Sequence, residues 1–396
     1  MTNGSPLAGN DADLLTGLLT RMVGCRSDNP GTYESGMAAL VVEMLQELTS
    51  CEITLVESMP GRPSVAAVLK GSRSDAPSLV INGHLDTVPV DDETLWTFPP
   101  FEATVRDGLV YGRGACDMKA GLAAQIAVAA ALSRRPERLA GSLILHFAAG
   151  EERAEPGTRS LLDAGFGGTY GIVTEPTDLA VAGVARGLAY YDIRIEGRSV
   201  HSSRPQFGCN PIAALPAVLE VLNTYGATIG QQVHPLLPPA SSSPTIVRGG
   251  EVANMIPDVA HLIIDRRMLP HEDAGTELQS LRLLLQGAAV EEGIRITVEQ
   301  EPMHFASADG TSTDTLGRTV REVAADVTGA PREAWGTPYS SDMRVLVNEG
   351  GMEAVTFGPG SITQAHAPDE HVEISQVVAA TRILTGVAEK LLRVPQ

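Results

Sequence analysis

The segment SLVINGHLDTVP, residues 78–89, joins a short apolar run to a histidine and an aspartate. Three more apolar runs of strand length lead into similar residues. They are 142–149 before Glu151 and Glu152, 170–174 before Glu175, and 352–357 before the segment that contains His366. In an open α/β sheet the ligand site lies beyond the carboxyl ends of the strands. We therefore expect four segments to deliver carboxylates and imidazoles to one edge of a sheet.

Helical and extended patterns alternate around these runs. Apolar residues have helical spacing in 14–23, 36–48, 119–133 and 374–392, whereas 52–57 and 64–69 have the pattern of extended strands. This alternation predicts an α/β fold with a mostly parallel sheet that helices cover on both faces.

The pattern changes between residues 181 and 302. Strand and helix signals follow one another there in the order βαββαβ, which predicts a two-layer α+β domain of the ferredoxin-like type with an antiparallel sheet. The α/β pattern then resumes. We therefore predict a larger domain in two parts, 1–180 and 303–396, with a smaller domain inserted at 181–302.

Composition narrows the classes of protein. The 396 residues are 43% hydrophobic and 19% charged, as in soluble globular proteins, and the formal net charge is −19. Such a chain repels phosphate backbones and anionic membranes, so we expect no nucleic-acid or membrane partner. Residues 1–13 lack a secretory signal pattern, and no uninterrupted apolar run reaches membrane-spanning length. These features favour a cytoplasmic protein.

Histidines and carboxylates, rather than cysteines, carry the metal-binding signal. Asp117, in YGRGACDMKAG at 111–121, adds a carboxylate just before a helical segment, and the four cysteines are scattered without a CxxC pair. Mixed nitrogen and oxygen ligands suit Zn²⁺, with Co²⁺ or Mn²⁺ as substitutes. His366 competes with His371 as a ligand, and the preceding Gly-Pro-Gly favours His366.

Residue spacing assigns further roles. Side chains two apart in an extended segment point to the same side, so Asp86 is expected to accept the ring N–H of His84 while the other ring nitrogen binds metal. Glu151 and Glu152 are adjacent and point in opposite directions. One of them can bind metal while the other acts as a general base towards water.

Seven motifs in order resemble one known family. They are GHLDTVP, YGRGACDMKAG, AAGEE, TEPT, HSSRPQFGCNP, DRRMLP and FGPG followed by AH. The chain is similar, from about residue 10 to 390, to the acetylornithine deacetylase, succinyl-diaminopimelate desuccinylase and carboxypeptidase G family. The resemblance implies a zinc-exopeptidase-like fold with two zinc ions, and an inserted domain that serves as a lid and dimerisation domain of a homodimer.

The resemblance also implies a role for each site residue. Asp117 would bridge the two ions, with His84 and Glu175 on one ion, Glu152 and His366 on the other, and Glu151 as the general base. In the inserted domain, His201 would reach the active site of a partner subunit and stabilise the oxyanion. Arg267 would bind the α-carboxylate of the substrate, and Asn254 and Arg186 would be further substrate contacts.

The function expected is hydrolysis of the amide bond of an N-acyl-L-amino acid, as in a deacetylase or desuccinylase. Glutamate rather than aspartate at position 175 favours the deacylase and carboxypeptidase G branch of the family. The alternative is a carboxypeptidase or dipeptidase with the same site, acting on a dipeptide-like substrate. A catalytically silent homologue that only binds is a distant third hypothesis.

Overall fold

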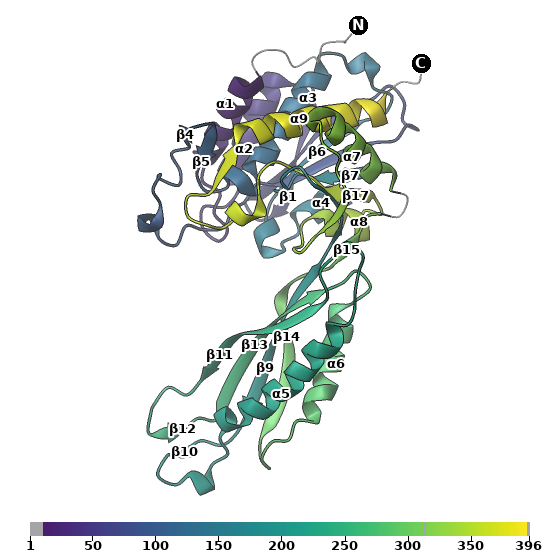
Figure 1. The fold of residues 1–396 in the computed structure, drawn as a ribbon. Coiled ribbons are helices and arrows are strands. Elements are labelled where there is room, and N and C mark those ends of the chain that lie inside the picture. The colour runs from purple at the N-terminus through teal and green to yellow at the C-terminus, as the bar shows by residue number, and fades with distance from the viewer. Residues whose placement is uncertain (1–10, 312–313, 394–396) are drawn as a thin grey trace. The chain divides into compact units, whose positions relative to one another are not determined.

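The computed structural model describes residues 11–311 and 314–393, and the chain divides into two compact units (Figure 1). The large unit comprises Met1–Val184, Asp309–Gly336 and Ser341–Gln396, and the small unit comprises Ala185–Ala308 and Thr337–Ser340. Residues 1–10, on which the expectation about a signal pattern partly rests, lie outside the described residues. In the sequence, the small unit interrupts the large one.

A nine-stranded sheet forms the centre of the large unit, in the order β1-β2-β6-β3-β7-β17-β8-β15, with β16 beside β8. The strands are β1 (Glu52–Met59), β2 (Arg62–Leu69), β3 (Leu79–His84), β6 (Leu143–Ala148), β7 (Tyr170–Val173), β8 (Val181–Ala185), β15 (Ala308–Asp309), β16 (Ala334–Thr337) and β17 (Glu353–Thr356).

The expectation of a mostly parallel sheet is wrong, because the sheet is mixed. β6, β3, β7 and β17 run parallel, whereas β1 pairs antiparallel with β2, β2 with β6, and β17 with β8. Only Pro60 and Gly61 separate β1 from β2, and so short a connection can only reverse the chain. Parallel pairing needs a longer crossover, which the central strands have.

The register of the parallel strands brings their carboxyl ends to one edge. His84 at the end of β3 pairs with Ala148 at the end of β6. Val173 of β7 lies between Asn82 of β3 and Thr356 of β17. The residues that follow these four strands therefore leave the sheet at the same edge.

Helices cover both faces of this sheet (Figure 1). One face carries α1 (Asp11–Val23), α2 (Ser35–Leu48), α3 (Ala120–Ser133), α7 (Thr315–Thr328) and α9 (Ile374–Leu392), and the other carries α4 (Gly157–Asp163) and α8 (Met343–Asn348). Strand residues alternate between the two layers. In β2, Val65 and Ala67 belong to the main core, while Ala66 packs with Leu161 of α4.

Two helical stretches, Ala115–Ser133 and Pro211–Ile229, are long and apolar enough to cross a membrane. The first, which contains α3, is entirely buried in the large unit. A helix that is hydrophobic all round fits the interior of a large domain. The second lies in the small unit, and only 28% of its apolar window is buried.

A separate three-stranded sheet joins two distant parts of the large unit. It has the order β18-β5-β4, formed by β4 (Thr104–Arg106), β5 (Leu109–Tyr111) and β18 (His371–Glu373). His371 pairs with Tyr111. The segment before Asp117 and the segment after His366 are thereby held side by side.

The small unit is an antiparallel sheet with two helices. Its main elements are β9 (Gly187–Glu196), α5 (Pro211–Ile229), β11 (Ser241–Gly249), β13 (Val259–Met268), α6 (Ala274–Gln286) and β14 (Arg295–Phe305). The strand order is β11-β13-β9-β14, and β10 (Val200–His201) pairs with β12 (Met255–Ile256) in a separate ribbon. Residues of β13 alternate between buried and half-buried, which leaves one face of the sheet for the helices.

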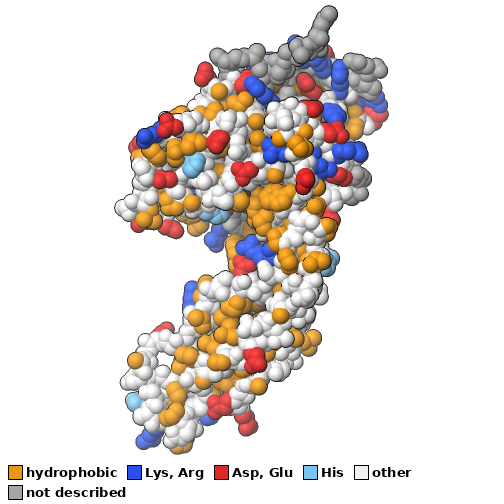
Figure 2. Space-filling view, viewed as in Figure 1, with side chains coloured by type: hydrophobic (Ala, Val, Ile, Leu, Met, Phe, Trp, Pro, Cys, Tyr) orange, Lys and Arg blue, Asp and Glu red, His pale blue; other side chains and the backbone are white. Residues whose placement is uncertain are grey.

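Figure 2 shows hydrophobic side chains on the surface of both units. Among the described residues, more of the exposed large hydrophobic side chains lie in the small unit than in the large one. Those of the small unit are Phe207, Ile212, Val233, Ile246, Val247, Val252, Met255, Leu283 and Leu284.

Candidate metal centre

His84 ends β3 with a buried imidazole whose two nitrogens face different groups. Nδ1 donates a hydrogen bond to the main-chain carbonyl oxygen of Asp86, at 2.8 Å. Nε2 lies 3.1 Å from Oδ1 of Asp117 and 3.6 Å from Oε1 of Glu175. The imidazole is thus oriented through Nδ1, and Nε2 faces the carboxylates.

The Asp86 side chain does not have the partner that residue spacing predicts. Its nearest carboxylate oxygen is 3.6 Å from Nδ1 of His84, because the main-chain carbonyl takes the ring N–H. The carboxylate instead accepts hydrogen bonds from the backbone N–H groups of Gly150, Glu151 and Glu152, at 3.1, 3.1 and 3.2 Å. Asn29 Nδ2 donates a fourth, at 2.9 Å. Burial raises the pKa of Asp86 to about 7.

The imidazole of His366 approaches the carboxylate of Asp117 from a different segment than His84 does. Its Nε2 lies 3.4 Å from Oδ2 of Asp117 and 3.2 Å from Oε2 of Glu152. The two oxygens of Asp117 therefore face two different imidazoles, Oδ1 towards His84 and Oδ2 towards His366. His366 has a φ of 63°, which is uncommon for a residue with a side chain and is often found at functional sites.

These side chains form a donor set that fits divalent metal ions. Ligand atoms of His84, Asp117 and Glu152 lie within 4.8 Å of one another, as do those of His84, Glu151 and Glu175. Oε1 of Glu152 is buried and has no hydrogen-bond partner among the described residues. Imidazole nitrogens with carboxylate oxygens are the ligands of Zn²⁺ and related ions.

Burial and neighbouring charges shift the pKa values of the groups in this cluster. Burial raises the pKa of Glu175 well above its usual value and that of Glu151 to about 8. Hydrogen bonds with Asp117 and Glu152 raise the pKa of His366 to about 10. Burial thus disfavours the charged form of Glu151 and Glu175, and a cation held between these carboxylates would stabilise that form.

One basic residue near the cluster, Arg344, lies outside the motifs found in the sequence. Arg344, on α8, places Nη1 3.4 Å from Oε1 of Glu151 and 3.5 Å from Oδ1 of Asp342. Asp342 also accepts a hydrogen bond from Thr158 Oγ1, at 2.6 Å. Arg344 is 193 residues from Glu151, and its spacing in the sequence carries no signal of this contact.

Two predicted site residues lie in the ribbon of the small unit. His201, on β10, is exposed, and its Nδ1 is 2.8 Å from Oγ of Ser203. Asn254 precedes β12, and its carbonyl oxygen accepts a hydrogen bond from the N–H of Ser202, at 2.9 Å. The ribbon thus brings His201 and Asn254 into neighbouring positions.

The two predicted arginines of the small unit also lie near one another. Arg267, on β13, forms an ion pair with Asp265, in which Nε lies 2.8 Å from Oδ1. Nη2 of Arg186 donates to Ser241 Oγ at 2.8 Å and lies 3.5 Å from the carbonyl oxygen of Arg267. Burial, together with the positive charges of Arg267 and Arg266, lowers the pKa of Arg186. Neighbouring guanidinium groups of this kind suit an anionic group.

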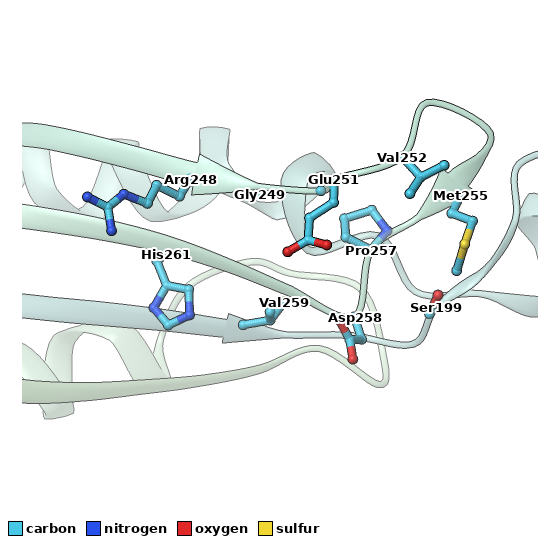
Figure 3. Close-up of a pocket in the computed structure, with 11 residues that line it drawn as sticks. Ser199, Arg248, Gly249, Glu251, Val252, Met255, Pro257, Asp258, Val259 and His261 are labelled. Carbon is cyan, nitrogen blue, oxygen red and sulfur yellow. The ribbon is translucent and has the colours of Figure 1, made fainter.

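A pocket of about 520 Å³ lies in the small unit beside the ribbon formed by β10 and β12 (Figure 3). Arg248 and His261 lie towards one end of it, and Val252 and Met255 towards the other. Nδ1 of His261 lies 3.1 Å from Oδ2 of Asp192. None of the predicted metal ligands lines this pocket.

Comparisons with known proteins agree with this centre. The sequence pattern of the peptidase family M20/M25/M40 matches residues 80–390. The chain is 27% identical over 421 residues to an N-formyl-4-amino-5-aminomethyl-2-methylpyrimidine deformylase of Halalkalibacterium halodurans, covering 95% of this chain and 93% of the relative. It is 32% identical over 322 residues to a succinyl-diaminopimelate desuccinylase of a Caulobacter species, covering 77% and 79%.

Solved structures share the fold. An M20 family metallo-carboxypeptidase of Sulfolobus solfataricus has a TM-score of 0.78 at 19% identity, covering 97% of this chain and 99% of that one. A dinuclear metal-binding peptidase of Bacillus subtilis has a TM-score of 0.73 at 20% identity, covering 96% and 98%.

The resemblance found in the motifs is thereby confirmed, as is the prediction of a metal-dependent hydrolase of amide bonds. The matched region contains every predicted metal ligand, from His84 to His366. This chain belongs to the peptidase family M20/M25/M40.

Proposed function

We propose that this member of the family is a two-metal hydrolase that cleaves the amide bond of an N-acyl-L-amino acid, as deacetylases and desuccinylases do. One observation carries the proposal furthest. The oxygens of Asp117 face His84 at 3.1 Å and His366 at 3.4 Å, as a carboxylate shared between two ions would. The desuccinylase relative supports an N-acyl amino acid as the substrate class.

We assign each ligand to an ion by the imidazole that it lies beside. Asp117 is shared, His84 and Glu175 hold one ion, and Glu152 and His366 hold the other. Zn²⁺ is the ion that this donor set favours, with Co²⁺ or Mn²⁺ able to substitute. When bound, such ions lower the pKa of water towards neutrality and polarise an amide carbonyl.

Glu151 is the remaining carboxylate of the cluster and the proposed general base. It accepts a proton from water at one carboxylate oxygen and then donates that proton to the nitrogen of the leaving amine. Burial raises its pKa to about 8, and a group whose pKa is near neutrality can serve in both steps. Arg344, at 3.4 Å from Oε1, restricts the orientation of this carboxylate.

The small unit supplies the proposed substrate contacts. Arg267 binds the α-carboxylate of the substrate through its planar fork, and Arg186 and Asn254 are further contacts. Support for Arg186 comes from its buried Nε, which has no hydrogen-bond partner among the described residues. His201 is proposed to serve the active site of a partner subunit by stabilising the oxyanion, as the motif resemblance implies.

That role of His201 requires a homodimer, which we propose forms through the small unit. β11 is an edge strand with exposed residues from Ser243 to Gly249. Edge strands and exposed apolar side chains both favour association. Sedimentation velocity tests this proposal, and a monomer at micromolar concentration contradicts it.

Metal analysis combined with a substrate panel tests the proposed function. The panel contains N-acetyl, N-succinyl, N-formyl and N-carbamoyl amino acids and dipeptides. We expect two equivalents of metal and release of a simple acyl group. Preferential cleavage of dipeptides or folate-like conjugates would favour the carboxypeptidase or dipeptidase alternative. Two bound equivalents without any cleavage would indicate a silent homologue.

A further inference from the structure

Glu370 is a fully buried glutamate that none of the proposed catalytic steps uses. Its carboxylate lies among four donors. Oε1 accepts from the backbone N–H groups of Cys116 and Asp117, at 2.9 and 3.0 Å. Oε2 accepts from the N–H of Gly114 at 3.0 Å and from Arg113 Nη1 at 2.6 Å. Each oxygen therefore has two donors, and the carboxylate holds the segment that ends at Asp117.

The same residue belongs to the segment that carries the second imidazole. Glu370 follows His366 by four residues and precedes β18, whose pairing with β5 brings the two segments together. The N–H of Gly112 donates to the carbonyl oxygen of Glu370, at 2.8 Å. Arg113 completes the connection, since its Nη2 donates to the carbonyl oxygen of His366 at 3.4 Å.

We infer that Glu370 is a positioning residue that fixes Asp117 and His366 relative to one another and thereby sets the affinity of the metal centre. This inference rests on the proposed function. Asp117 and His366 come from segments about 250 residues apart in the sequence, and a shared ligand must face both ions at once. Glu370 and Arg113 tie the two segments to each other.

The neighbouring residue Asp369 serves as a control that distinguishes a positioning role from ordinary stabilisation of a loop. Oδ1 of Asp369 accepts from the backbone N–H groups of Thr97 and Phe98, at 2.7 and 3.3 Å. The segment around Thr97 contains no proposed metal ligand. Asp369 therefore makes the same type of contact as Glu370, next to it in the sequence, without holding the metal centre.

The test compares Glu370→Gln with Asp369→Asn in the full chain. Glutamine keeps the shape of the side chain, but either orientation of its amide places an NH₂ group against two donors. Metal affinity is measured without substrate, by Co²⁺ titration and by Zn²⁺ competition with a chelator. We expect at least ten-fold weaker binding of one ion in Glu370→Gln, because groups that orient metal ligands typically contribute 10–100-fold. Asp369→Asn is expected to change the affinity less than two-fold.

A second readout shows whether Glu370 only stabilises the fold. Saturating metal raises the Tm of a protein that binds it in the folded state. A merely structural defect lowers the Tm of the metal-free protein and leaves the metal-induced rise unchanged. We expect Glu370→Gln to reduce that rise and Asp369→Asn to preserve it.

A further variant keeps the test decisive if Glu370→Gln does not fold. Arg113→Met removes the donors to Glu370 and His366 while keeping the aliphatic part of the side chain, and we expect it to weaken metal binding in the same direction. Metal affinities in the Glu370 or Arg113 variant equal to that of Asp369→Asn would overturn the inference and leave the proposed function standing. An unchanged protein that binds no divalent metal would instead refute the proposed function, and the inference with it.

Discussion

Asp86→Asn tests whether the Asp86 carboxylate shapes the turn that carries the two glutamates. Oδ1 accepts from the N–H groups of Gly150 and Glu151, and Oδ2 accepts from the N–H of Glu152 and from Asn29. The asparagine amide replaces one oxygen with an NH₂ group, so two donors lose their acceptor whichever way it is oriented. The substitution is otherwise close to isosteric.

The magnitude follows from these contacts. Burial raises the pKa of Asp86 to about 7, so the comparison is made above that pH, where the carboxylate is ionised. A hydrogen bond to a charged group contributes about 1.5–3 kcal/mol, so two of them amount to about 3–6 kcal/mol. A neutral amide avoids part of the cost of burying a carboxylate, which places the expected loss in the free energy of unfolding near the lower value, about 3 kcal/mol. The displaced turn also moves Glu151, and we expect kcat to fall by about 10²-fold.

Urea unfolding of the full chain in the presence of a chelator measures the loss in the free energy of unfolding. Steady-state kinetics with metal then measure the fall in kcat. Asp92→Asn is the control, since Asp92 accepts from the N–H of Thr94 at an exposed position of the same unit. Asp92→Asn is expected to lower the free energy of unfolding much less than Asp86→Asn does. Unfolding of Asp86→Asn within about 0.5 kcal/mol of the unchanged protein would refute the role of Asp86 as the acceptor for this turn.

Three other substitutions test separate parts of the structure. Glu151→Ala should lower kcat by about 10²–10⁴-fold while the metal content stays intact, because it removes the proposed base and not a ligand. Loss of metal by atomic absorption would show that the roles of the two adjacent glutamates are exchanged. Arg267→Ala should raise KM for carboxylate substrates far more than it lowers kcat, and an unchanged KM would exclude the proposed contact. Burial lowers the pKa of His146 to about 4, whereas an unfolded histidine titrates near 6.5. The unfolded state therefore binds more protons between these values, and the free energy of unfolding falls by up to about 3 kcal/mol as the pH drops from 6.5 to 4. His146→Gln should flatten this part of the pH profile in urea unfolding, and an unaltered slope would contradict it.

Local sequence patterns predicted the elements that position the centre. Helical spacing of apolar residues over 374–392 matches α9, and the apolar run at 170–174 overlaps β7, which ends two residues before Glu175. Such patterns work because each helix or strand buries one side or both, and its apolar period records that burial. The placement of acidic residues and histidines after the strands then predicted which side chains gather at one edge.

The sequence by itself thus determined the strands, the helices and the candidate ligands, while the tertiary structure decided how they connect. Strand direction at the sheet edge depended on the two-residue turn at Pro60 and Gly61 and on which strand β2 joined. The acceptor for His84 proved to be a main-chain carbonyl, which no side-chain spacing encodes. Arg344 and Glu370 meet the centre from segments 193 and about 250 residues away from their partners. Such contacts arise only when distant segments pack together, because a hydrogen bond depends on position in space and leaves no periodic signal along the chain.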